Sequence, residues 1–171
     1  MITPDTKDWT WVLREPCPEC GLAAGDVDPT TVGDRTRATL PTWEDVLERD
    51  DARERPDEDT WSPTEYACHV RDVFRLFAGR AALMLEQNDP LFENWDQDET
   101  AVAEHYELQD PADVAPQLVE AGNRIADVFD AVPADAWTRT ARRSDGAEFT
   151  VATLAQYFIH DIEHHLHDVG A

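Results

Sequence analysis

Residues 61–77 read WSPTEYACHVRDVFRLF and contain the strongest helix signal in the chain. Ser62 is suited to the N-cap, Pro63 to the first helical position and Glu65 to the third, which together make a capping box. The apolar side chains that follow recur at helical spacing, and His69 lies on the same face as they do. The pattern predicts a long helix that directs His69 toward the core or a cleft.

Further helices are predicted on both sides of this segment. The expected elements are a helix over residues 29–49 that Pro41 should break or kink, the capped helix to about residue 87, a helix over residues 111–132, a short hairpin over residues 137–150 and a last helix over residues 150–169. Residues 88–110 form an irregular acidic crossover, which is long for a bundle loop. We expect an all-α fold, an antiparallel four-helix bundle with a short hairpin before the last helix.

The length of 171 residues is that of one ordinary domain. Residues 1–28 have no helical period and are expected to form an irregular N-terminal arm, followed by the bundle over residues 29–171. No apolar run approaches the roughly 20 residues of a membrane span, and the N-terminus lacks the pattern of a signal peptide. We therefore expect a cytoplasmic protein.

The composition is strongly acidic. Thirty-seven Asp and Glu stand against 14 Lys and Arg, which gives a formal net charge of −23. Such a chain repels a phosphate backbone, so we expect neither a nucleic acid nor a membrane as partner. The surplus acid indicates a solvated surface that aids solubility. The sequence does not fix the oligomeric state, and a homodimer is one alternative.

Four of the six histidines lie in the last predicted helix, where residues 158–169 read FIHDIEHHLHDV. His160 and His164 lie one turn apart on one face, so their imidazoles can hold a single ion. A third imidazole from another helix would complete a three-His site with open positions, as in catalytic metal sites. The alternative is a solvated histidine stripe, because the apolar residues of this helix centre nearly opposite the pair. His165, nearer the apolar side, is interpreted as a core histidine.

The capped helix with its histidine and the final H-x3-H pair resemble the DinB-like proteins, also called damage-inducible or YfiT-like four-helix bundles. The resemblance covers about residues 29–169. It implies that His69, His160 and His164 correspond to the three metal-binding histidines of the family. The implied cofactor is a divalent metal ion, with zinc as the first expectation and nickel, iron or manganese as alternatives.

The resemblance implies two kinds of function. As an enzyme, the protein would use the ion to activate a nucleophile, and no catalytic residue beyond the metal-bound water or thiol is identified. PCPECG at residues 16–21 resembles actinobacterial members, for which a thiol S-transferase of the mycothiol type, acting on small electrophiles, is the sharpest version and a hydrolase another. Trp95 of the crossover would then help shape the acceptor pocket. The alternative is a non-catalytic metal-binding stress-response bundle.

Cys17 and Cys20 have the spacing of half a zinc ribbon. Because no second cysteine pair exists, three alternatives stay open: a second metal site with histidine or acidic ligands, a redox disulfide, or a plain turn with reduced thiols. Three carboxylates are candidates to orient a ligand imidazole, with surface or capping roles as the alternative: Glu65, Asp72 and Asp161.

Overall fold

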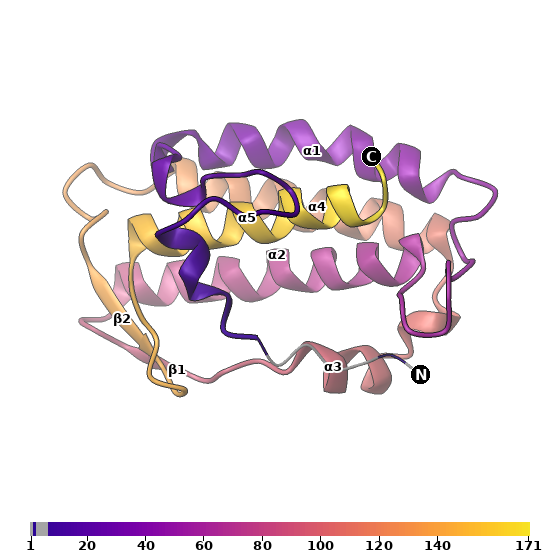
Figure 1. The fold of residues 1–171 in the computed structure, drawn as a ribbon. Helices are drawn as coiled ribbons and strands as arrows, with labels where there is room; N and C mark the ends of the chain where they lie inside the picture. The colour runs from indigo at the N-terminus through magenta and orange to yellow at the C-terminus, as the bar shows by residue number, and fades with distance from the viewer. Residues whose placement is uncertain (1, 3–6) are drawn as a thin grey trace.

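A computed structural model describes residue 2 and residues 7–171 of the protein. Four long helices lie side by side in a bundle (Figure 1): α1 (Val32–Leu47), α2 (Pro63–Glu86), α4 (Pro111–Asp130) and α5 (Val151–Asp168). Helix α4 packs against both α1 and α2. Helix α5 also contacts these two helices. The predicted helical bundle is confirmed. Residues 1 and 3–6 of the expected arm lie outside the described residues.

Helix α2 begins with the predicted capping box. The Ser62 hydroxyl accepts a hydrogen bond from the Glu65 amide at 3.3 Å, and the Glu65 carboxylate accepts one from the Ser62 amide at 2.8 Å. Although burial alone would raise the pKa of Glu65, the hydrogen bonds from Arg55 and Ser62 lower it. The cap fixes where the helix begins, and it thereby places His69 in the second turn with 1% of its surface exposed.

Aromatic side chains fill the space between the helices. The ring of Phe158 on α5 lies 5.9 Å from Phe74 on α2 and 5.4 Å from Phe129 on α4. Helix α4 approaches its neighbours closely at Gly122, where a Cβ atom would lie 2.4 Å from Leu40 and 2.9 Å from Phe74. Apolar packing of this kind supplies most of the stability of a helical domain.

A three-stranded sheet lies at one end of the bundle (Figure 1), in the order β1 (Leu91–Phe92), β2 (Thr140–Arg143), β3 (Glu148–Thr150). The last two strands form the predicted antiparallel hairpin, in which Ala141 is opposite Phe149. Strand β1 comes from the crossover and pairs in parallel with β2. The all-α class is therefore corrected to a helical fold with a small sheet. A strand of two residues has no periodicity that a sequence could reveal.

Two other expectations are also corrected. Helix α1 continues through Pro41, so the expected break is corrected, whereas a kink at this residue stays a prediction. The crossover is more regular than predicted, since it contains β1, α3 (Gln97–Ala103) and the 3-10 helix η4 (Tyr106–Leu108). Tyr106 is buried and donates a hydrogen bond to Asp72 at 2.6 Å, which ties the crossover to α2.

Residues 7–31, here called the N-terminal segment, lie across α5. They contain three short 3-10 helices: η1 (Trp9–Leu13), η2 (Ala24–Asp26) and η3 (Pro29–Thr31). Figure 1 shows this indigo segment in front of α5, and η1, η2 and η3 all contact that helix. Val12 and Ala24 have no exposed surface. The segment therefore covers a face of α5 that the other bundle helices leave open.

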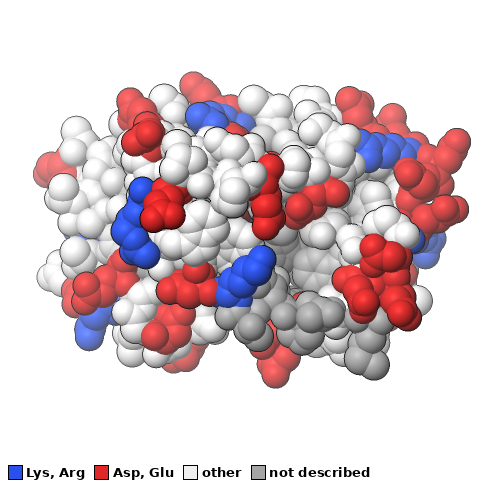
Figure 2. All heavy atoms as spheres, viewed as in Figure 1, with Lys and Arg blue, Asp and Glu red and all other residues white. Residues whose placement is uncertain are grey.

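The surface carries the acidic surplus. Figure 2 shows Asp and Glu side chains spread over the visible face, with fewer Lys and Arg among them. Some of the cations join helices, as Arg37 on α1 does through ion pairs of 2.6 Å to Asp127 and 2.7 Å to Asp130 on α4. Exposed pairs of this kind contribute about 0–1 kcal/mol each. Among the described residues, no helix has the length and apolar character needed to cross a membrane.

Candidate functional site

Helix α5 presents possible metal ligands to two different neighbours. Among the described residues, the candidate donors form two groups, each with its donor atoms within 4.8 Å of one another. We call them the His-Asp group, which comprises His69, Asp161 and His165, and the Cys-His group, which comprises Cys17, Cys20, His160 and His164. The predicted triad of His69, His160 and His164 is thus divided, and neither group contains all three.

The His-Asp group joins α2 to α5. His69 Nε2 lies 3.5 Å from Asp161 Oδ2, and His165 Nε2 lies 3.6 Å from Asp161 Oδ1. The rings of His69 and His165 meet edge to face with their centroids 4.7 Å apart. These separations exceed those of good hydrogen bonds, so the three side chains converge without bonding firmly to one another.

Buried atoms of this group lack hydrogen-bond partners in the described structure. They are both ring nitrogens of His69 and Oδ2 of Asp161. An unsatisfied buried polar group costs about 1–3 kcal/mol, which makes such atoms rare unless something else binds them. Two imidazoles and a carboxylate are a donor set that zinc and other first-row metal ions accept. The residues present therefore fit a divalent metal ion.

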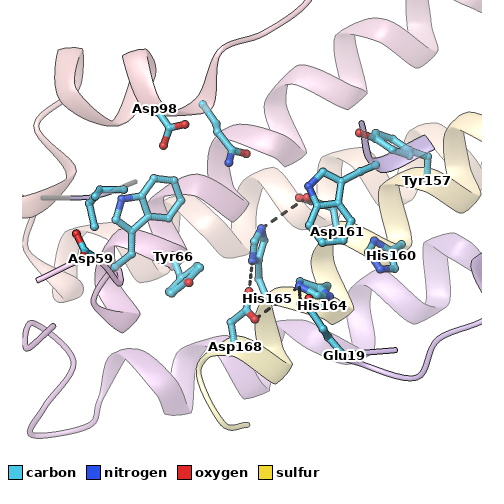
Figure 3. Close-up of a pocket in the computed structure, with 14 residues that line it drawn as sticks. Glu19, Asp59, Tyr66, Asp98, Tyr157, His160, Asp161, His164, His165 and Asp168 are labelled. Carbon is cyan, nitrogen blue, oxygen red and sulfur yellow. Dashed lines mark hydrogen bonds and ion pairs between the residues drawn. The ribbon is translucent and has the colours of Figure 1, made fainter. Parts of the chain in front are cut away.

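Asp168 orients His165 within the group. Figure 3 shows His165 between two carboxylates, with its Nδ1 atom 2.8 Å from Asp168 Oδ2 and its Nε2 atom toward Asp161. A carboxylate on one ring nitrogen fixes the tautomer and turns the other nitrogen toward a metal. Although burial alone would lower the pKa of His165, Asp161 and Asp168 raise it to about 9. The two carboxylates thus favour positive charge at this point.

Aromatic rings enclose the two histidines. Trp95, from the crossover, stacks on His69 with ring centroids 5.5 Å apart and an interplanar angle of 16°. Trp61 lies against the same imidazole, also at 5.5 Å, and Tyr66 lies 5.3 Å from His165. This enclosure explains why burial lowers the pKa of His69. It also holds the His69 ring in one orientation.

A cavity of about 280 Å³ opens on the group. Asp161 and His165 line it, together with His160 and His164 (Figure 3). Its described lining has no Lys or Arg but five carboxylates, which belong to Glu19, Asp59, Asp98, Asp161 and Asp168. Such a wall attracts cations and disfavours anions.

A second cavity, of about 390 Å³, also reaches the group. His69 and Asp161 line it, so Asp161 borders both cavities. Unlike the lining of the first cavity, its lining includes basic as well as acidic side chains, namely those of Lys7, Arg80 and Arg143. Burial, with a smaller contribution from Arg143, lowers the pKa of Arg80 to about 10. The His-Asp group is therefore accessible from two chemically different spaces.

The Cys-His group joins the N-terminal segment to α5. Cys17 Sγ lies 3.6 Å from His164 Nδ1, and the rings of His160 and His164 are 5.1 Å apart. Burial, then the neighbouring His164, lowers the pKa of His160 to about 4. Cys17 and Cys20 are free thiols. The cover provided by the N-terminal segment explains why His160 and His164 are buried and not part of a solvated stripe.

The carboxylates proposed from the sequence have different neighbours. Glu65 bonds to the helix cap and to Arg55. Asp72 accepts hydrogen bonds from Tyr106 and from Arg71. Neither belongs to a candidate ligand group, whereas Asp161 is itself a candidate ligand.

Sequence reasoning missed His165 as a candidate ligand and Asp168 as its partner. A signal for His165 was present, because Asp161 and His165 repeat the spacing of His160 and His164 one residue later. One residue is about 100° of helix rotation, so the two pairs face different neighbours. Nothing in the sequence indicates which pair faces α2.

Comparisons with known proteins agree with the fold. The family model of the DinB superfamily matches residues 33–169. Among solved structures, the chain is similar to YfiT from Bacillus subtilis, which is described as a probable metal-dependent hydrolase with an unusual four-helix bundle topology. The two are 18% identical, the match covers 81% of each chain, and the TM-score is 0.68. At this identity the likeness shows the fold alone. No curated protein matches the chain.

Proposed function

The chain belongs to the DinB superfamily, and from this premise we propose that it is a metal-dependent enzyme whose ion is held by the His-Asp group. The observation that supports the proposal is an incomplete ligand set at a cavity. His69, Asp161 and His165 offer three donors, and the cavity of about 280 Å³ borders two of them. Structural zinc sites have four protein ligands, whereas catalytic ones keep a position open.

Each residue of the group has a defined task in this proposal. When bound, the ion would lower the pKa of a thiol or water molecule that ligates it and so supply a nucleophile at neutral pH. Asp168 accepts the Nδ1 proton of His165 and so leaves the Nε2 atom, which faces Asp161, to bind the ion. Trp61 and Trp95 exclude water from the faces of His69 that they cover.

For the nucleophile, we propose a low-molecular-weight thiol of the mycothiol type that is transferred to a small electrophile. The thiol sulfur forms a bond to a carbon of the acceptor, the acceptor's leaving group departs with the electron pair of the broken bond, and the thiol proton passes to solvent. The family resemblance supports this version. The presence of two cavities at one ligand group also suits a reaction with two substrates.

Hydrolysis is the second candidate. The described function of YfiT supports it, because the same ligand set would activate water in place of a thiol. The two candidates differ in a single requirement, which is whether turnover consumes a thiol. A non-catalytic metal-binding bundle is the third alternative.

The test uses protein without a histidine tag, loaded with zinc. Chlorodinitrobenzene with mycothiol reports thiol transfer, and a panel of activated esters and amides without thiol reports hydrolysis. Turnover should require metal and should be lost in His165→Ala. His167→Ala is the matched control, because His167 lies on the same helix, is exposed and belongs to neither group.

The outcomes separate the alternatives. Thiol-dependent turnover supports the transferase, and thiol-independent turnover supports the hydrolase. If the His-Asp group binds zinc and neither reaction occurs, the enzyme proposal is wrong. If His165→Ala and His167→Ala behave alike, the assignment of the ion to the His-Asp group is wrong.

A further inference from the structure

The Cys-His group has the donors of a second metal site. Two thiols and two imidazoles form the closed ligand set of structural zinc, and all four donor atoms lie within 4.8 Å of one another. With the usual bond lengths, tetrahedral zinc places a sulfur and a nitrogen ligand about 3.6 Å apart. Cys17 Sγ and His164 Nδ1 are 3.6 Å apart. We propose that Cys17, Cys20, His160 and His164 bind a structural zinc ion that fastens the N-terminal segment to α5.

The backbone around the two cysteines is folded into a tight turn. The Gly21 amide donates to the Cys17 carbonyl at 2.8 Å, and the Cys17 amide donates to the Leu22 carbonyl at 2.9 Å. Gly21 has a φ of +78°, which a residue with a side chain rarely adopts. The turn thus brings both thiols to the same side, where their sulfur atoms lie within 4.8 Å of each other.

The two histidines each have one nitrogen available to the ion. His160 is 3% exposed, and its Nε2 atom is buried without a hydrogen-bond partner in the described structure. His164 directs Nδ1 at Cys17, while its Nε2 atom lies 3.3 Å from Glu19 and 3.6 Å from Asp168. Metal-bound histidines characteristically have a carboxylate at the second ring nitrogen. His164 is therefore arranged as a metal-bound histidine is, and His160 offers a buried nitrogen that lacks a hydrogen-bond partner in the described structure.

The ion would hold a wall of the proposed active site. The N-terminal segment carries Trp9, whose ring lies 5.7 Å from that of His160 and 5.2 Å from that of His164. Trp9 lines both cavities that open on the His-Asp group. Zinc binding joins residues that are distant in the chain, because Cys17 and His164 are 147 positions apart. The second site is thereby structural, although it shapes the space in which the first one acts.

The site predicts a specific metal content and spectrum. Full-length, reduced, tag-free protein should bind two zinc ions per chain. Replacement by cobalt should give the intense near-ultraviolet charge-transfer band of thiolate ligation. Cys17→Ser and Cys20→Ser should each lose one metal equivalent and this band. Cys68→Ser is the matched control, since Cys68 is a buried cysteine on α2 outside both groups.

The measurements distinguish this site from the His-Asp group. His165→Ala should lose the metal equivalent of the His-Asp group and keep the thiolate band. The proposal for either site can therefore be disproved without affecting the proposal for the other. The spectrum of the wild-type protein is decisive even if the serine variants do not fold. The inference is overturned if reduced wild-type protein shows no thiolate–cobalt band, if Cys17→Ser and Cys68→Ser retain the same metal content, or if zinc-loaded protein forms a Cys17–Cys20 disulfide.

Discussion

The Cys-His and His-Asp groups take their ligands from the same helix, yet they have different partners. Each uses two residues of α5 that are four positions apart. The N-terminal segment completes the first pair with two thiols, whereas α2 completes the second pair with one imidazole. Four donors, two of them thiols, fill every coordination position of a tetrahedral ion. Three donors at a cavity leave one coordination position open. The element that faces a pair of ligands on α5, more than the spacing of the pair, thus decides which kind of metal site the pair can form.

One carboxylate outside both groups contacts a histidine of each. Asp168 lies 2.8 Å from Nδ1 of His165 and 3.6 Å from Nε2 of His164. Its contact with His165 is a hydrogen bond, whereas the other is a longer ion pair that Glu19 supplements at 3.3 Å. The groups are therefore separable, but the His-Asp group depends more on Asp168.

The largest effect is expected from breaking the His-Asp group at His69. His69→Ala should lower metal affinity at this group by more than about 100-fold, because the loss of a ligand exceeds the 10–100-fold effect of losing a partner of a ligand. The thiolate–cobalt band should remain. Competition with a chelator measures both affinities, and His105→Ala, at an exposed histidine of the crossover, is the control. A parallel loss at both groups would show that they are one site.

A smaller effect is expected at the carboxylate that contacts both groups. Asp168→Ala should weaken metal binding by the His-Asp group about 10–100-fold, and should weaken the Cys-His group less because Glu19 remains. The pKa of His165 in metal-free protein should fall from about 9, since Asp168 is one of the charges that raise it. Chelator competition and NMR titration of the imidazole measure the two results.

A control on the same helix makes this test specific. Glu163 binds Arg35 through two hydrogen bonds of 2.8 Å and belongs to neither group. Glu163→Ala should therefore leave both affinities unchanged. Equal losses at the two groups in Asp168→Ala would contradict the asymmetry between them.

Local signals explain how much the sequence could predict. The capping box of α2 depends on Ser62 and Glu65 alone, and both of its hydrogen bonds are present. The parallel pairing of β1 with β2 was not predicted, because it joins Leu91 to Arg142, 51 positions later in the chain, and a strand of two residues shows no pattern. Where contacts lie within a few residues, the sequence suffices, and where they span the chain, it does not.

The same distinction applies to the candidate site. Helical periodicity placed His160 and His164 on one face, but it could not show whether that face is solvated. The answer depends on Cys17 and the segment around it, 147 positions before His164. Nor could periodicity choose between this pair and the pair one residue later, Asp161 and His165. That choice depends on how α5 is rotated relative to α2, which the packing of the whole bundle determines.

The smallest effect is expected from loosening the N-terminal segment without touching a ligand. A Cβ atom at Gly25 in η2 would lie 2.2 Å from the carbonyl oxygen of Leu13 in η1. This neighbour is backbone and cannot rotate away, so Gly25→Ala should separate the two turns and destabilise the docked segment by about 1–3 kcal/mol.

Gly25→Ala should therefore weaken metal binding by the Cys-His group about tenfold and leave the His-Asp group unchanged, because the latter is built only from α2 and α5. Gly79→Ala is the matched control: it lies on an exposed face of α2 with nothing within 4 Å of a Cβ atom, and it should stabilise the helix by about 0.5–1 kcal/mol. Chelator competition and the rate of protease cleavage within the segment measure the effect. If cleavage accelerates while the Cys-His group keeps its metal affinity, zinc binding by this group does not depend on the docking of the N-terminal segment. If both groups weaken together, the segment supports the bundle as a whole, and the separation between the two groups is wrong.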